Sequence, residues 1–174
     1  MDRVTILVDT REQLPLEFDP GRVTTIRRAL PAGDYSLDGF ERVVAVERKS
    51  LQDYVSSILR IAGRFGRELT LLSTYELGCV VVEGSLEDVI AHRYRSGVDP
   101  RSVFGATLAI VVDWRVPVFF CGDRQIAGRF IEGLLLRFHR KVRERCRKAR
   151  PDSQGETEVG VGKPNVPPSP SAAE

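Results

Sequence analysis

The amino-acid sequence predicts a single α/β domain in which a mixed central sheet is flanked by helices. After residue 43, short apolar runs rich in β-branched residues alternate with segments of helical periodicity, a pattern typical of parallel strands joined by helices. Before residue 43, three strand-like runs are separated by Pro- and Gly-rich turns, so we expect these first strands to form a meander. The 174 residues are enough for one sizeable domain and a tail.

The expected strands are 4–8, 23–30, 35–37, 43–48, 79–83 and 116–121. The expected helices are 51–63, 64–76, a short helix after Ser85, 103–114, and a long helix from Asp123 to about residue 147. Asp38-Gly39 is a strong hairpin signal, and this turn would bring Asp34 back opposite the Glu47 end of the next strand. We expect residues 1–148 to form the domain and residues 149–174 a disordered tail, because the tail has no apolar periodicity.

The composition is that of an ordinary soluble protein, with 42% apolar and 29% charged residues. No apolar run reaches the ~18 residues that a membrane helix needs, and the N-terminus lacks a signal-peptide pattern. The three cysteines are widely spaced, with Cys79 and Cys121 in apolar runs where free buried thiols are usual. We therefore expect an intracellular protein, in the cytoplasm or nucleoid, without a membrane association.

The net charge of +2 is unevenly distributed along the chain. Residues 1–136 carry seventeen basic and nineteen acidic side chains, whereas residues 137–150 carry eight basic and one acidic. Such local basicity fits a nucleic-acid contact surface, although a run of charge is also common on a solvated helix face. The role of this basic segment stays open.

The segment 43–53, VVAVERKSLQD, concentrates the chemistry of the chain. Its first half reads as a buried strand, and Ser50 with Asp53 forms a variant of the capping box that starts a helix. Because strand side chains alternate between faces, Glu47 and Lys49 should project to one side of the sheet and Arg48 to the other. A carboxylate and an ammonium group would thus lie side by side at a rigid strand end.

Carboxylates on adjacent strands supply the hard oxygen ligands that Mg²⁺ or Mn²⁺ prefers, and Asp34 and Glu47 fit this requirement. Lys49 could orient an attacking water or offset negative charge that develops on a phosphate. Asp9 ends a neighbouring strand and would add a third carboxylate, with Glu12 either close behind it or exposed. Such a cluster of acids would repel itself without a cation, which favours a metal site.

Several arginines lie near this segment and could bind phosphate. Arg11 could bind one phosphate with two parallel hydrogen bonds. Arg48, Arg60, Arg64 and Arg67 could contact a DNA backbone, or they could simply face solvent. Asp53 is equally balanced, because its capping position gives it a structural explanation beside a role in the site.

The ordered set of residues resembles the motif of the XPF/Hef-type structure-specific DNA endonucleases, G-D-(x)n-E-R-K-x-x-x-D. It is present as Gly33-Asp34, Glu47-Arg48-Lys49 and Asp53, and the upstream V-D-x-R-E element is present at residues 8–12. The resemblance implies a restriction-endonuclease-like fold and a Mg²⁺ or Mn²⁺ cofactor. It implies that Asp34, Glu47 and the backbone carbonyl of Arg48 hold the metal, that Lys49 is catalytic, and that Asp9, Arg11 and Asp53 support the site.

The same resemblance implies an endonuclease that cuts branched or junction DNA in repair or recombination, usually as a homodimer. The alternative is a non-catalytic subunit of the same family that only dimerises or binds DNA. Family members commonly carry a tandem helix-hairpin-helix domain after the nuclease, and the tail here lacks the apolar periodicity of one, so a separate partner or the basic helix would have to bind DNA. The apolar residues of the last helix cover more than one face, which favours a dimer interface: Ile126, Phe130, Ile131, Leu134, Leu135 and Phe138.

Overall fold

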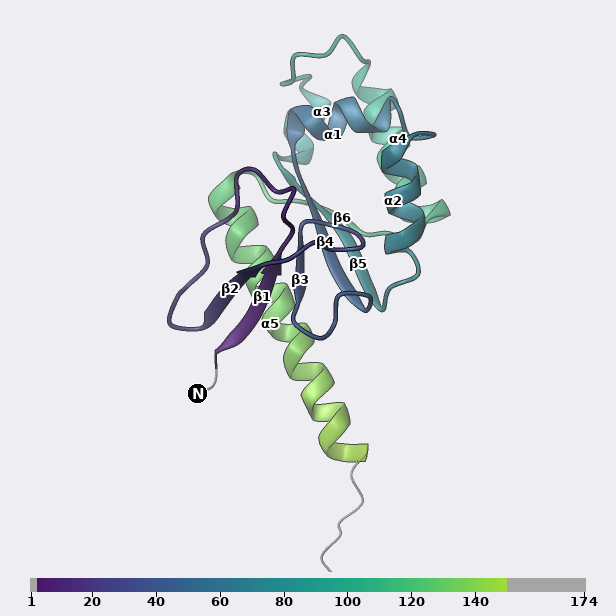
Figure 1. Ribbon diagram of the computed structural model, residues 1–174. Helices are drawn as coiled ribbons and strands as arrows, with labels where there is room; N and C mark the ends of the chain where they lie inside the picture. The colour runs from purple at the N-terminus through teal and green to yellow at the C-terminus, as the bar shows by residue number, and fades with distance from the viewer. Residues whose placement is uncertain (1–2, 150–174) are drawn as a thin grey trace, which may run out of the picture.

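The computed structural model describes residues 3–149, and Figure 1 shows a mixed sheet with helices on both sides. The strands are β1 (Val4–Val8), β2 (Val23–Arg27), β3 (Tyr35–Leu37), β4 (Val44–Ser50), β5 (Leu77–Glu83) and β6 (Val118–Phe120). The helices are α1 (Leu51–Ile58), α2 (Arg64–Leu72), α3 (Leu86–Ile90), α4 (Pro100–Asp113) and α5 (Arg124–Ala149). The predicted element order is confirmed, with most boundaries within four residues. The domain boundary near residue 148 stays a prediction, because the tail lies outside the described residues.

The six strands form one sheet in the order β2-β1-β3-β4-β5-β6. Strand β3 is antiparallel to both of its neighbours, β1 and β4, whereas β4, β5 and β6 are parallel to one another. The expected meander is wrong for the first pair, since β2 runs parallel to β1. The physical reason is the long connection over residues 9–22, which is of the length that a crossover between parallel strands requires.

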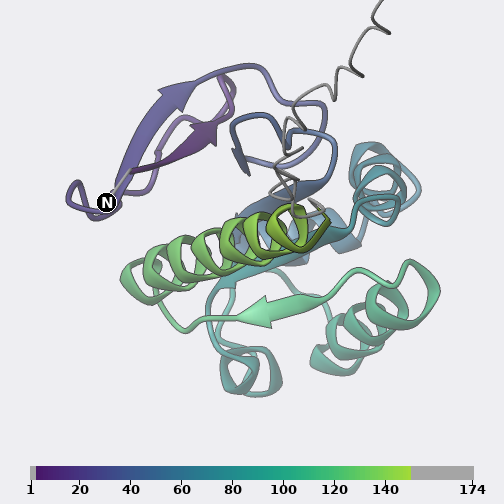
Figure 2. The ribbon, with the colours of Figure 1, turned by 90° about the horizontal axis from the view of Figure 1, so that it is seen from below.

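Two hydrophobic cores lie on the two faces of this sheet. On one face, α5 packs against alternate residues of the strands, including Val44 and Val46 of β4. On the other face, α1, α2, α3 and α4 pack against the intervening residues, including Ala45. Figure 2 shows α5 lying apart from α4, as two opposite layers require. This alternation along β4 decides which functional side chain meets which layer.

Helix α4 differs from the buried helix that its apolar sequence predicts. Val103 and Ile110 are buried, but the opposite face of the helix is exposed. That face carries Phe104, Leu108, Val111 and Val112, with exposed fractions from 38% to 70%. Because α4 contacts the rest of the domain along one side only, its apolar excess has no partner within residues 3–149.

The last helix shows the reverse. Of its six apolar residues that favoured a dimer interface, Ile131, Leu135 and Phe138 are buried in the core, and Phe130 and Leu134 pack against it. Ile126 is half exposed. Core packing therefore explains most of the apolar excess of α5, and the expected interface on this helix is not what the fold presents. Within the described residues, no helix is long and apolar enough to cross a membrane.

Candidate active site

The strand register brings Asp34 and Glu47 to the same edge of the sheet. Val8 pairs with Tyr35, and Tyr35 pairs with Val46, so the residues just beyond these pairs are neighbours. Backbone hydrogen bonds join the segments: Asp34 donates its N–H to the carbonyl of Val46 (2.8 Å), and Asp9 donates its N–H to the carbonyl of Asp34 (2.8 Å). The predicted meeting of Asp34 with the Glu47 end of β4 is thus confirmed at the level of the backbone.

Glu47 and Lys49 point to the same side, as their spacing predicts. Lys49 Nζ donates to Glu47 Oε1 at 2.7 Å and lies 4.7 Å from the centre of the Phe65 ring. Glu47 is only 6% exposed. Burial raises the pKa of the Glu47 carboxyl well above its usual value, and the negative charge of Asp34 raises it further, while Lys49 opposes the shift. Glu47 therefore binds a proton more readily than an exposed glutamate does. A metal cation in place of the proton would equally offset the cost of burying the negative charge.

Asp34 is half buried and accepts a hydrogen bond from the backbone N–H of Arg48 at 2.8 Å. Burial raises the pKa of Asp34 to about 6, an effect that this N–H reduces and that the charges of Glu12 and Glu68 reinforce. The preceding residue, Gly33, has a φ of +71°, and a Cβ there would lie 2.9 Å from the Val46 carbonyl oxygen. Only glycine fits this turn, which explains the Gly-Asp pair of the motif.

An open pocket of about 430 Å³ lies beside Glu47 and Lys49, between the end of β4 and helices α1 and α2. The charged side chains that line it are Glu47, Lys49, Asp53, Arg60, Arg64 and Glu68. Asp53 also accepts a hydrogen bond from Ser50 Oγ at 2.7 Å, so its capping role and its place in the pocket coexist. Arg67 is exposed but does not line the pocket.

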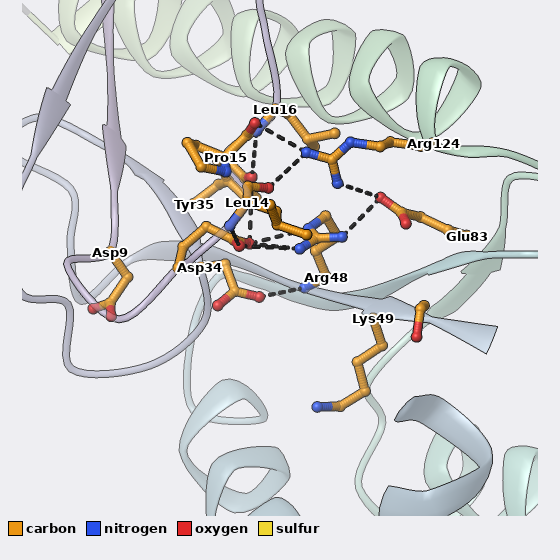
Figure 3. A network of polar contacts seen from close by, with 12 residues as sticks. Asp9, Leu14, Pro15, Leu16, Asp34, Tyr35, Arg48, Lys49, Glu83 and Arg124 are labelled. Carbon is orange, nitrogen blue, oxygen red and sulfur yellow. Dashed lines mark hydrogen bonds and ion pairs between the residues drawn. The ribbon is translucent and has the colours of Figure 1, made fainter. Parts of the chain in front are cut away.

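Arg48 points away from the pocket, toward the α5 layer, where it joins a closed network (Figure 3). Its guanidinium donates to both oxygens of Glu12 (2.9–3.0 Å) and to Glu83 Oε1 (2.8 Å). Arg124 at the start of α5 shares Glu83 and also holds the carbonyl oxygens of Leu14 and Pro15. The Arg48 side chain is 12% exposed, so its predicted contact with DNA does not fit this placement, whereas its carbonyl remains beside Glu47.

Asp9 differs from the predicted third metal ligand. One of its oxygens accepts from the backbone N–H of Arg11 (2.8 Å) and from Arg11 Nε (2.6 Å). The other accepts from the N–H of Leu30 (2.6 Å) and from Arg11 (3.1 Å). Both oxygens are occupied and the residue is buried, so Asp9 fixes the loop after β1. Arg11 is half exposed, and its charge also acts on Asp34 and Glu68.

The expected cluster of four acids is therefore divided. Asp9 is paired with Arg11 and Glu12 with Arg48. Glu47 lines the pocket, and Asp34 lies at the same edge of the sheet, where its N–H is bonded to the carbonyl of Val46. Within residues 3–149, no three His, Cys, Asp or Glu side chains converge closely enough to hold a metal ion by themselves. Two carboxylates and a backbone carbonyl fit Mg²⁺ or Mn²⁺, because these ions keep several waters and use few protein ligands. The residues present are thus compatible with the expected cofactor.

Glu68 is the residue of this site that sequence reasoning missed. It lies on α2, lines the pocket, and accepts a hydrogen bond from the backbone N–H of Gly33 at 3.2 Å. A helical signal was available, because Glu68 follows Arg64 by four residues and so shares its face of the helix. The motif itself gave no indication of Glu68, because it ends at Asp53.

The comparisons with known proteins agree with this geometry. The family model of the ERCC4 domain matches residues 8–134. The chain is 27% identical over 141 residues to a protein named 3'-flap repair endonuclease Xpf from Saccharolobus solfataricus, covering 78% of this chain and 56% of that protein. It is 32% identical over 117 residues to a protein of Methanocaldococcus jannaschii that carries the name of an ATP-dependent RNA helicase, covering 67% of this chain and 13% of that protein.

Among solved structures, XPF from Aeropyrum pernix in complex with DNA aligns with a TM-score of 0.62 and 29% identity, over 80% of this chain and 66% of that one. A second structure of XPF from Aeropyrum pernix aligns with a TM-score of 0.61 and 26% identity, over 83% of this chain and 69% of that one. The expected restriction-endonuclease-like fold is confirmed by these neighbours. The chain spans about half the length, or less, of the curated relatives it matches. The predicted resemblance to the XPF/Hef-type endonucleases is confirmed, and the chain belongs to the ERCC4 domain family.

Proposed function

We propose that this chain is a Mg²⁺- or Mn²⁺-dependent DNA endonuclease that hydrolyses phosphodiester bonds in branched or junction DNA. The observation that supports this most is the placement of Glu47 and Lys49 in one open pocket, with Asp34 at the same edge of the sheet, within an ERCC4 domain. The likeness to an XPF in complex with DNA supports DNA as the partner. The acids and the lysine are all present, which argues against the non-catalytic alternative.

Each residue has a distinct role in the proposed reaction. Asp34, Glu47 and the carbonyl of Arg48 would hold the divalent cation, which when bound polarises a phosphoryl oxygen and makes hydroxide available near neutral pH. Lys49, held by Glu47, would face the scissile phosphate and offset the charge that develops there. Arg48 positions Asp34 through its backbone N–H and anchors the strand end through its side chain.

Arginines at the rim of the pocket would bind the DNA backbone. Arg60 and Arg64 line the pocket and are exposed, so they are placed to contact phosphates that flank the cut. Arg11 and Arg67 would contact phosphates farther along the duplex. Arg145 and Lys141 of the basic helix pair with Glu76, which leaves its other basic residues for DNA or for a partner.

The direct test is cleavage of a panel of flaps, forks, bubbles and plain duplex with Mg²⁺ or Mn²⁺, beside Lys49→Ala. We expect cutting of branched substrates that needs the metal and is lost in Lys49→Ala, while the variant still binds DNA and stays folded. Cutting by Lys49→Ala at the normal rate would reject the site assignment. Absence of any metal-dependent cutting, with intact DNA binding, would favour the scaffold alternative.

We also propose a homodimer formed through α4 rather than α5. The exposed apolar face of α4 is unusual for a monomeric surface and is of the kind that dimer interfaces bury. Two-fold symmetry would pair this face with itself. Light scattering after gel filtration tests this: Leu108→Glu with Val112→Glu should give a monomer, whereas Ile26→Glu on the far edge strand should not change the mass. A wild-type monomer at micromolar concentration would contradict the proposal.

A further inference from the structure

The carboxylates around the site fall into two groups. Asp9, Glu12 and Glu47 each form an ion pair. Within residues 3–149, Glu68 forms none and accepts a hydrogen bond from the backbone N–H of Gly33, just as Asp34 accepts one from the backbone N–H of Arg48.

Glu68 nevertheless lies close to the proposed metal ligands. It lines the same pocket as Glu47, and its hydrogen bond to Gly33 places its carboxylate beside the residue that precedes Asp34. Its carboxylate is therefore within reach of the hydration shell of a cation held by Asp34 and Glu47.

The hydrogen bond to Gly33 gives Glu68 a fixed position. Gly33 forms the turn directly before Asp34, with a φ of +71°. The hydrogen bond from its N–H therefore holds one oxygen of Glu68 beside a proposed metal ligand. A simple structural role would need only the hydrogen bond and not the charge, so the two explanations can be separated by experiment.

We propose that Glu68 is a further cation-binding residue, which completes the site of Asp34 and Glu47 by contacting the hydration shell of the divalent ion. An outer contact fits because the three side chains do not converge closely enough to ligate one ion directly. It also fits the preference of Mg²⁺ to keep several waters. This inference rests on the proposed metal dependence of the enzyme.

The test is calorimetric titration of the full chain with Mn²⁺ alone, comparing Glu68→Gln, Glu68→Ala and wild type. Glutamine keeps an oxygen for the Gly33 N–H but removes the charge. We expect Glu68→Gln to weaken Mn²⁺ binding about tenfold, as for residues that support metal sites from the outer shell. Glu87→Gln, an exposed glutamate on α3, is the matched control and should bind as wild type does.

A cleavage titration sharpens the result. The rate of Glu68→Gln should recover at higher Mn²⁺, whereas that of Lys49→Ala should not. Wild-type affinity in Glu68→Gln would overturn the inference, even if Glu68→Ala were impaired, because only the hydrogen bond would then matter. The proposed metal dependence itself fails if the wild type binds neither Mn²⁺ nor Mg²⁺, whether or not it cleaves branched DNA. The wild-type titration alone shows that outcome, so it is distinguishable from a failure of the role of Glu68.

Discussion

The two faces at the end of β4 carry charged residues of the same kinds, but these residues are fully paired on one face and only partly paired on the other. On the α5 side, Arg48 and Arg124 meet Glu12 and Glu83, and every guanidinium and carboxylate has a partner. On the α1 and α2 side, Lys49 meets Glu47, while Asp34 and Glu68 form no ion pair among residues 3–149 and each accepts a backbone N–H instead.

The difference shows how one strand can serve two purposes. Alternation sends consecutive residues to opposite layers, so a fully paired network on one face can fix the backbone that carries carboxylates without ion pairs on the other. Charges that are paired and buried hold structure, whereas carboxylates that form no ion pair beside an open pocket are available to bind a cation. Variants on the two faces should therefore differ in what they change: stability on the α5 side, and cleavage or metal binding on the α1 and α2 side.

The largest effect is expected for Lys49→Ala on the open face. Loss of a positioned charge at the reacting phosphate should lower the cleavage rate roughly 1000-fold. The fold should be nearly unaffected, because Glu47 takes up a proton readily once its partner is gone. Single-turnover cleavage with saturating enzyme measures the rate, and Lys141→Ala, whose side chain lies on the outside of α5, is the control. A loss below tenfold would contradict the role of Lys49.

Arg48→Ala on the closed face should act on stability. It leaves the buried carboxylate of Glu12 without its ion pair, while Glu83 keeps Arg124, and breaking the buried pair should lower the free energy of unfolding by about 3 kcal/mol. Urea unfolding followed by circular dichroism measures this. Arg28→Ala is the matched control, since its ion pairs with Asp38 and Glu41 are on the surface and should matter little. Equal stability of the two variants would erase the contrast between the faces.

Added metal should stabilise the protein through the open face only. At Mn²⁺ about 100-fold above its dissociation constant, ligand linkage predicts about 2.7 kcal/mol of added stability for wild type. Glu47→Gln removes one proposed ligand and should lose most of this gain, whereas Glu83→Gln on the closed face should keep it relative to its own metal-free state. Thermal unfolding with and without Mn²⁺, and with EDTA added back, measures the shift in Tm. A shift that survives in Glu47→Gln would place the metal elsewhere.

The smallest effect is expected at the rim of the pocket. Arg64→Ala should weaken DNA binding a few-fold for every sequence and reduce the salt dependence by about one counterion. Fluorescence anisotropy at several salt concentrations measures both. Arg95→Ala, in the loop after α3, lies outside the lining of the pocket and serves as the comparison. An unchanged salt slope in Arg64→Ala would argue that this arginine faces solvent without a phosphate contact.

The sequence alone determined the order of the elements and the central residues of the candidate site. Period-two alternation fixed Glu47 and Lys49 on one side of β4 and Arg48 on the other, and the hairpin signal at Asp38-Gly39 placed Asp34 opposite. These are local properties, because neighbouring residues and short turns determine them. Both capping residues, Ser50 and Asp123, were also predicted correctly, since each binds a backbone N–H three residues away.

Only the tertiary structure decided the remaining assignments. Whether Asp9 and Glu12 face the proposed metal site or are paired with Arg11 and Arg48 depends on which loop packs behind them, and spacing carries no information on that. Glu68 joins the site because α2 folds over the Gly33 turn.

The same dependence on tertiary contacts explains why the exposed faces of the apolar helices and the pairing of the first strands were not predicted. The sequence showed that α4 and α5 are both rich in apolar residues, but not which faces the sheet would cover. The parallel pairing of β1 and β2 likewise depends on the path of a long loop. Contacts between residues far apart in the chain determine these features, and one-dimensional patterns record only what lies within a few residues.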